Sequence, residues 1–184
     1  MSKKLFVNIA SLGLLQLANY VFPFLTVPYL SRVLSTSHYG LILFSLSFTT
    51  YFAILCDYGF GLTGTKAVAT NANQPEQLNR LVSNITVIKS ALFVFSLILN
   101  LIIVFSYGQF REYWFIYAIN IFTLINSIFF PTWFFQGMER MKYITLVQVA
   151  VRSLAVVLIL CIVKHDSDYY LWPVINLLTT IIGV

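Results

Sequence analysis

Residues 90–110, SALFVFSLILNLIIVFSYGQF, carry no acidic or basic side chain and are almost entirely apolar. About 20 such residues in an α-helix are needed to cross the roughly 30 Å hydrocarbon core of a bilayer. A backbone at that depth finds no water, so its N–H and C=O groups must be paired within the segment, as they are in a helix. This stretch therefore predicts a transmembrane α-helix.

Similar charge-free runs lie on both sides of residues 90–110, and together they set the number of helices. These runs are Leu5–Ser31, Val33–Cys56, Tyr113–Met138, Tyr143–Val163 and Tyr169–Val184. The run from Tyr143 qualifies only if Arg152 is accepted inside the membrane, and the last run reaches the final residue. The sequence predicts an all-α, polytopic transmembrane helix bundle of about six spans, in which residues 1–184 form a single membrane domain.

The composition of the chain excludes a water-soluble fold. Hydrophobic residues make up 59% of the 184 residues and charged residues only 9%, whereas soluble domains have about 45–50% and about 25%. The net charge of +5 comes from bases that stand singly at the ends of apolar runs. This spacing suits helix ends that face anionic headgroups, and not the clustered basic stripe of a nucleic-acid binder. We therefore expect membrane lipid, and no nucleic acid, among the partners.

Basic residues are distributed unequally between the two predicted faces of the membrane. If the N-terminus is cytoplasmic, the cytoplasmic flanks hold Lys3, Lys4, Lys66, Arg80, Arg140 and Lys142, and the outer loops hold Arg32, Arg111 and Lys164. Because short cytoplasmic loops carry an excess of Lys and Arg, we predict a cytoplasmic N-terminus.

The longest predicted connection, residues 57–80, contains three glycines and then Asn73-Gln-Pro-Glu76. Asn is a favoured helix cap, and Pro and an early acidic residue are favoured in a first turn. The connection therefore predicts a loop that ends where the third helix begins. Asp57 and Lys66 flank the glycines, and we consider an ion pair between them at the cytoplasmic rim.

Polar residues within the predicted spans fall on one face of each helix when they are projected at about 100° per residue. These faces hold Asn8, Ser11, Gln16, Asn19, Pro23 and Thr26 in the first span, Lys89, Ser96 and Asn100 in the third, Asn120, Thr123, Ser127 and Pro131 in the fourth, and Thr145, Gln148 and Arg152 in the fifth. Such faces either form hydrogen-bonded helix contacts, which is the favoured interpretation for the uncharged residues, or line a wet cavity.

The two cations on these faces favour the cavity interpretation. A Lys or Arg near the bilayer centre costs on the order of 2.5–3.5 kcal/mol on insertion scales, and the third to fifth spans contain no acidic residue to offset it. Lys89 lies near a helix end, where its amine can reach the headgroups. Arg152 is deeper, so it is the stronger candidate to line a water-filled cavity that accepts an anion.

One acidic pair raises the question of catalysis. Asp166-Ser-Asp168, beside His165, has the spacing with which many nucleotide-sugar transferases hold a metal, so a membrane-embedded glycosyltransferase or polymerase is an alternative function. A solvated loop is the more common role of two such acids, and the predicted orientation turns them away from the cytoplasm. The sequence contains no P-loop, zinc-ligand spacing or nucleophile elbow. We predict no catalytic residue, no metal and no cofactor.

Three groups of residues resemble one known family. PYLSRVL at 28–34, followed by Tyr39-Gly40, resembles the end of the first helix in bacterial polysaccharide-transporter flippases, the Wzx-type O-antigen exporters. DYGF at 57–60 with KAVA at 66–69 is similar to their second-helix exit, where the family often has Arg in place of Lys66. PTWFFQG at 131–137, followed by Glu139-Arg140 and Lys142-Tyr143, resembles their fourth-helix exit and is the most specific of the set.

The resemblance implies two six-helix lobes around a cavity that opens alternately to each side. This chain would be the N-terminal lobe, with an incomplete last helix and with a C-terminal lobe that is missing or is supplied by a partner half. The substrate would be an oligosaccharide on polyprenyl diphosphate, moved across the cell inner membrane. On this basis the expected site residues are Arg32, Lys89 and Arg152 for the diphosphate, and Asn19, Asn120 and Gln148 for the sugars.

Two further functions stay open beside the transferase. The chain could belong to a cation-coupled multidrug exporter of the same superfamily, but such a pump needs a carboxylate within a helix. The predicted spans have only Asp57, at an edge, and the basic residues favour an anionic substrate. The chain could also be a scaffold half that acts only in assembly with a partner.

Overall fold

The computed structural model describes residues 3–183, and every regular element in this range is helical. The elements are, in chain order, α1 (Lys3–Val33), α2 (Thr36–Asp57), α3 (Phe60–Thr70), α4 (Pro75–Ser106), α5 (Gly108–Glu112), α6 (Trp114–Phe122), α7 (Ile125–Phe129), α8 (Thr132–Gly137), α9 (Met141–Ile162), a 3-10 helix η1 (Asp166–Tyr170) and α10 (Leu171–Ile182). The predicted all-α polytopic bundle is confirmed.

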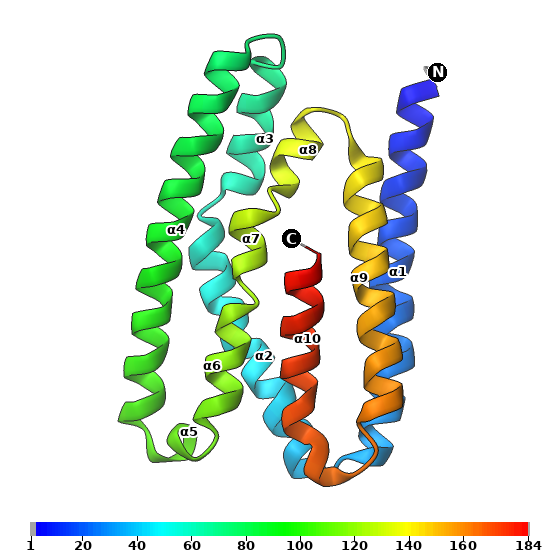
Figure 1. Ribbon diagram of the computed structural model, residues 1–184, viewed down its shortest axis with the longest axis vertical. Coiled ribbons are helices and arrows are strands. Elements are labelled where there is room, and N and C mark those ends of the chain that lie inside the picture. The colour runs from blue at the N-terminus through cyan, green and yellow to red at the C-terminus, as the bar shows by residue number, and fades with distance from the viewer. Residues whose placement is uncertain (1–2, 184) are drawn as a thin grey trace.

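Five segments of the described chain are long and apolar enough to cross a membrane. They are Phe6–Val33, Thr36–Thr70, Pro75–Ser106, Trp114–Gly137 and Met141–Ile162. The sixth predicted span corresponds to α10, which has 12 residues. It starts at the end of the bundle opposite the N-terminus and runs about halfway back (Figure 1). A sixth complete crossing stays a prediction.

The connections between helices gather at the two ends of the bundle. The start of α1 and the turns α3–α4 and α8–α9 lie at one end, and the turns α1–α2, α4–α6 and α9–α10 lie at the other (Figure 1). The two sets of basic residues that the sequence separates therefore belong to opposite ends. Which end faces the cytoplasm stays a prediction.

The expected long loop between the second and third spans is largely helical. Helix α3 continues α2 after a break at Tyr58 and Gly59, whose φ angles are 45° and 81°, in the left-handed region that glycine tolerates best. Asp57 thus lies inside a continuous apolar segment rather than at its edge. Pro75 begins α4 as predicted, but the cap position is Gln74, without a side-chain cap hydrogen bond, and not Asn73.

The fourth span is divided into α6, α7 and α8. Pro131 stands between α7 and α8, where its ring cannot donate a backbone hydrogen bond and the preceding residue is pushed out of helical geometry. Phe130 accordingly has ψ 85°. The second and fourth spans are both broken, and their outer pieces α3 and α8 pack on each other.

Helix α3 and α8 approach closely because glycine stands at both contact points. A Cβ atom on Gly64 would lie 2.9 Å from Cε3 of Trp133, and a Cβ on Gly137 would lie 2.6 Å from Cβ of Val68. The Thr65 hydroxyl, which donates to the Gly61 carbonyl at 2.6 Å, also lies 3.3 Å from the Trp133 carbonyl oxygen. We call α3 and α8 together the α3–α8 unit.

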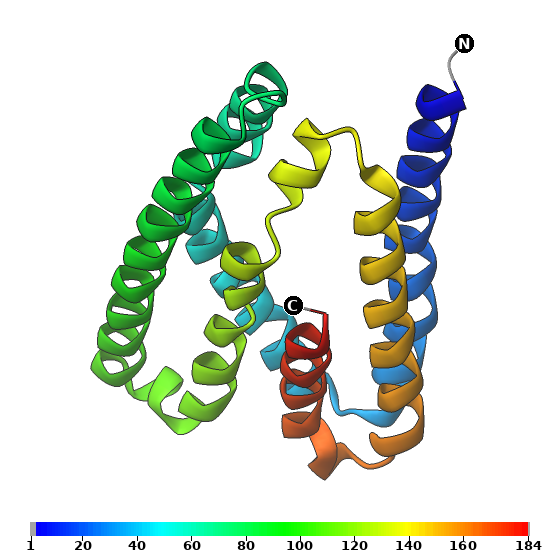
Figure 2. The same ribbon diagram turned by 45° about the horizontal axis from the view of Figure 1, so that its top comes forward.

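The remaining helices pack in two groups. Helix α1 lies along α9, and α10 packs between α9 and α6, while α2 packs against α4 and α6. Figure 2 shows the α1–α9 pair standing apart from α3 and α4, with α6, α7 and α10 between them. Many outward side chains are large and apolar, including Phe24, which is 78% exposed, and Leu62, which is 83% exposed. Such surfaces suit contact with lipid rather than water.

Polar and stacking contacts join two turns at the end of the bundle opposite the N-terminus. We call the residues that make them, Ser35, His38, Asp166 and Tyr169, the clamp. The Asp166 carboxylate accepts from the Ser35 backbone N–H at 2.6 Å and pairs with Nδ1 of His38 at 2.8 Å. The Tyr169 ring stacks on His38 with 4.0 Å between centroids. The clamp ties the α1–α2 turn to η1, and so fixes where α10 enters the bundle.

We expect Asp166→Asn to lower the unfolding temperature at neutral pH, and the difference from the unmodified chain to vanish in acid. The Ser35 N–H, and then His38, hold the pKa of Asp166 below its ordinary value. A carboxyl with a lowered folded pKa stabilises fully above its unfolded pKa of about 3.9, and its contribution is lost as the pH falls through the folded pKa. The difference in unfolding temperature is measured by thermal unfolding in detergent, at neutral pH and at several pH values below about 4. A difference that persists in the strongest acid contradicts it.

Candidate functional site

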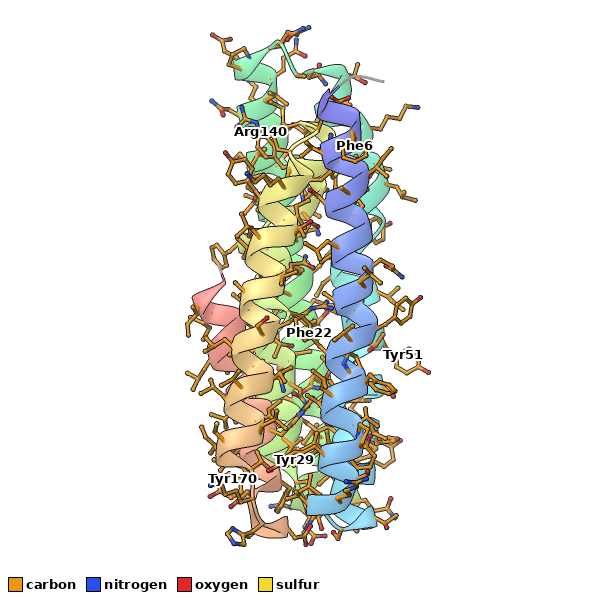
Figure 3. The ribbon with its side chains drawn as sticks, turned by 90° about the vertical axis from the view of Figure 1, so that its right-hand side faces the viewer. Phe6, Phe22, Tyr29, Tyr51, Arg140 and Tyr170 are labelled. Carbon is orange, nitrogen blue, oxygen red and sulfur yellow. The ribbon has the colours of Figure 1, made fainter. Side chains whose placement is uncertain are left out.

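The polar faces of α1 and α9 meet each other. Figure 3 shows the two helices side by side along their length, with Phe22 near their middle. The Thr145 hydroxyl on α9 donates to the Ser11 carbonyl on α1 at 2.9 Å, and the Arg152 guanidinium donates to Oδ1 of Asn19. For Ser11 and Thr145, the helix-contact interpretation of the polar faces is therefore the one that the structure supports.

Arg152 also lines a polar cavity. The cavity has a volume of about 250 Å³ and lies between α7, α9 and α10. Its lining includes Asn126, Gln148, Arg152, Asn176, Thr179 and Thr180. A second hollow of about 190 Å³ shares Arg152 and Asn176 and adds Phe22 and Trp172. Arg152 thus stands between two adjoining hollows.

The charge of Arg152 is not neutralised by an acid. Among residues 3–183, no carboxylate oxygen lies within 4 Å of its guanidinium, and its bonded partner is the neutral amide of Asn19. A guanidinium has five N–H donors, so several stay available for a ligand. Together with the amide and hydroxyl groups around the cavity, it can bind an anion such as a phosphate by charge-assisted hydrogen bonds.

Lys89 does not reach this cavity, and it has an acidic partner that the sequence did not suggest. Its Nζ lies 3.0 Å from Oδ1 of Asp57, and the lysine side chain is only 4% exposed. The expected pair between Asp57 and Lys66 is wrong, because the Asp57 carboxylate pairs with Lys89 instead and Lys66 is exposed on α3. The bend at Tyr58 and Gly59 places the end of α2 against α4, where Lys89 lies.

Asn120 and Arg32 are also placed away from the Arg152 cavity. Asn120 is 2% exposed, and its Nδ2 donates to the Ser45 hydroxyl at 2.8 Å, so it joins α6 to α2. Arg32 is exposed in the last turn of α1. Of the six predicted residues, the structure brings together Asn19, Gln148 and Arg152.

Several residues that line the cavity were not predicted from the sequence, because they belong to a short helix and to the last apolar run. Asn176, Thr179 and Thr180 lie within α10, and Asn126 lies in the short α7. Residues 176 and 180 are one helical turn apart and so share a face. Projecting the last apolar run in the same way as the others would have found them.

The Asp166 and Asp168 carboxylates are engaged in local structure. Asp168 accepts from the backbone N–H groups of Lys164 and His165 at 3.0 and 2.9 Å, and these bonds lower its pKa. Within residues 3–183, no group of three or more His, Cys, Asp or Glu side chains could hold a metal ion. The arrangement is that of a structured turn.

Five apolar spans, together with a polar cavity that is lined by Arg152, define a polytopic membrane protein with a cationic polar site. The chain belongs to the polysaccharide biosynthesis protein family, whose model matches residues 5–184. Two curated relatives are each named "Putative O-antigen transporter". The protein from Escherichia coli K12 is 29% identical over 88% of this chain, and that from Shigella dysenteriae is 31% identical over 88%. The chain spans 39% and 40% of their lengths. No solved structure matches it.

Proposed function

We propose that this chain takes part in export of a polysaccharide repeat unit, an O-antigen or related glycan, carried on polyprenyl diphosphate across the inner membrane. The observation that carries the proposal is the Arg152 guanidinium, which lines a polar cavity and has no acidic partner among residues 3–183. The names of the two curated relatives support the same class of substrate. The role is transport, not catalysis.

The chemistry of the cavity suits such a substrate. The diphosphate offers negative oxygens to Arg152, and the sugar hydroxyls can pair with amides and hydroxyls such as those of Gln148, Asn176 and Thr180. Asn19 orients the guanidinium from α1. The polyprenyl chain can stay among lipid tails, because it has no polar group to satisfy.

The mechanism we propose is alternating access, in which the cavity opens first to one leaflet and then to the other. Such movement needs a second body to close against, and the chain spans about two fifths of its curated relatives. We therefore propose that a second lobe, in the same reading frame or as a partner half, completes the cavity.

Export is tested in cells that lack their own exporter and accumulate the lipid-linked repeat unit on the cytoplasmic leaflet. The chain is produced alone and together with the C-terminal lobe of a curated relative. We expect labelled repeat unit to become accessible to a glycosidase supplied from the periplasmic side. Accessibility only with the second lobe supports the partner proposal. No accessibility in either case, or export of a cationic dye instead, contradicts the proposed function.

A further inference from the structure

A groove of about 510 Å³ lies between α1 and α9, at the end of the bundle where α1 begins. Its lining extends from Phe6 to Leu14 on α1 and from Lys142 to Ala150 on α9. Figure 3 shows Phe6 and Arg140, the residue before α9, at this same end of the helix pair. The two helices alone therefore form the groove.

The walls of the groove are mainly hydrocarbon. Seven of its ten lining residues are apolar, and they include the large side chains of Phe6, which is 63% exposed, and Leu146, which is 59% exposed. One polar lining residue, Thr145, donates its hydroxyl to the Ser11 carbonyl at 2.9 Å, so this donor is used between the helices. Sugar hydroxyls need many polar partners, and these walls offer few. The groove therefore suits an apolar chain better than a glycan.

The length of the groove matches one leaflet of a bilayer. Residues 6–14 and 142–150 each extend over about 12 Å at 1.5 Å per residue, and half of the hydrocarbon core is about 15 Å. Phe6 and Lys142 are the first and second residues of their membrane spans. The groove thus begins at the level of the headgroups and ends near the middle of the membrane.

Lys142 provides a cation at the outer end of the groove. Its side chain is exposed, and among residues 3–183 no carboxylate oxygen lies within 4 Å of its ammonium. A lysine can lay its aliphatic stem on an apolar surface while its charge reaches the headgroups. Arg140, which is also exposed, adds a second positive charge nearby in the sequence. A ligand with an apolar chain and a negatively charged head therefore complements the groove along its length.

The groove is separate from the cavity that Arg152 lines. Lys142, Leu146 and Val149 follow each other by four and three residues on α9 and so share a face, whereas Gln148 and Arg152 belong to another face. No described residue lines both the groove and the cavity. A ligand in the groove would leave the Arg152 site free.

We propose that the groove binds an acyl chain of an anionic phospholipid, whose phosphate pairs with Lys142. Basic residues between helix ends at the membrane surface attract lipids with a net negative headgroup, whereas a zwitterionic headgroup carries its own cation. The simple headgroup of a phospholipid needs no further hydrogen-bonding residues beside Lys142. This site is independent of the proposed function, because no glycan takes part in it.

Native mass spectrometry of the full chain in detergent tests the site. The probes are phosphatidylglycerol, which is anionic, and phosphatidylcholine, which is zwitterionic, with identical acyl chains. We expect the unmodified chain to bind phosphatidylglycerol about fivefold more strongly, the ratio that corresponds to one basic residue at a membrane surface. Lys142→Gln should bring the two affinities together. Equal binding of both lipids by the unmodified chain, or a preference that persists in Lys142→Gln, overturns the proposal.

Two further variants show whether the lipid lies in the groove. Ala150→Trp places a large side chain on an exposed position of the groove wall, so it should weaken binding of both lipids. Lys66→Gln removes an exposed cation of α3 that does not line the groove, and the lipid preference should be unchanged. Full binding by Ala150→Trp, or an equal loss of preference in Lys66→Gln, contradicts the assignment. If Ala150→Trp does not fold, Ala10→Leu on the opposite wall replaces it with the same expected result.

A polyprenyl phosphate has the same chemistry, an apolar chain with an anionic head, and is tested as a competitor. We expect it to displace phosphatidylglycerol no better than an equal amount of unlabelled phosphatidylglycerol does. Stronger displacement that is lost in Lys142→Gln would make the carrier lipid the occupant and overturn the phospholipid proposal. A failure of glycan export in cells would contradict the proposed function and leave this binding result unaffected.

Discussion

Replacing Arg152 by alanine is expected to lower export of the diphosphate-linked glycan by about tenfold or more, because hydrogen bonds to a charged group contribute about 1.5–3 kcal/mol and 1.4 kcal/mol corresponds to tenfold. The guanidinium is the cation of the polar cavity, and among the described residues no carboxylate within 4 Å competes for it. The measurement is the rate at which labelled repeat unit becomes accessible on the periplasmic side, at equal amounts of inserted protein.

Two control variants show whether the loss of export is caused by the change in the cavity. Arg32→Ala removes an equally basic but exposed side chain at the end of α1, and export should be retained. Arg152→Lys keeps the charge but not the planar set of donors, so it should rescue export only in part. Normal export by Arg152→Ala, or an equal loss of export in Arg32→Ala, contradicts the assignment of Arg152 to the binding site.

Replacing Gly137 by alanine is expected to destabilise the protein by about 1–3 kcal/mol, the usual cost of forcing an extra group into a packed contact. The added Cβ would lie 2.6 Å from Cβ of Val68 and 2.7 Å from the Thr65 carbonyl oxygen. The second of these atoms is backbone and cannot rotate away. Helices α3 and α8 must therefore separate, which we expect to measure as a lower unfolding temperature in detergent.

A glycine elsewhere in the bundle provides the control. Gly13 lies within α1, and a Cβ there would meet nothing within 4 Å. Gly13→Ala should therefore change stability by less than about 1 kcal/mol, in the stabilising direction expected for alanine in a helix interior. If Gly137→Ala is as stable as Gly13→Ala, α3 and α8 do not depend on glycine at position 137 for their close contact.

Local sequence features predicted the spans well and the connections poorly. Charge-free length identified five apolar segments that the structure contains, because a bilayer allows a single chain few ways to satisfy its backbone. The residues near the second-span exit were taken for a loop because they include three glycines. The structure uses one of them, Gly59, for a positive φ and another, Gly64, for a close contact with Trp133. Composition does not distinguish these roles.

The candidate site was predicted in part for a similar reason. Projecting α9 identified Gln148 and Arg152 as residues of one face, and both line the cavity. The projection treats every helix separately, so it could not show that Lys89 faces Asp57 or that Asn120 faces Ser45. Those partners are 32 and 75 residues distant along the chain.

Apolar length and the scarcity of charge alone were enough to predict a polytopic α-helical bundle, because hydrophobic transfer and backbone pairing are properties of each segment by itself. Only the tertiary structure decided which polar residue lines a cavity, which one joins two helices, and which cation has an acidic partner. These outcomes depend on the direction in which each helix face points and on where Pro131 and Gly59 break the spans. The arrangement leaves Arg152 facing a polar cavity and pairs Lys89 with Asp57.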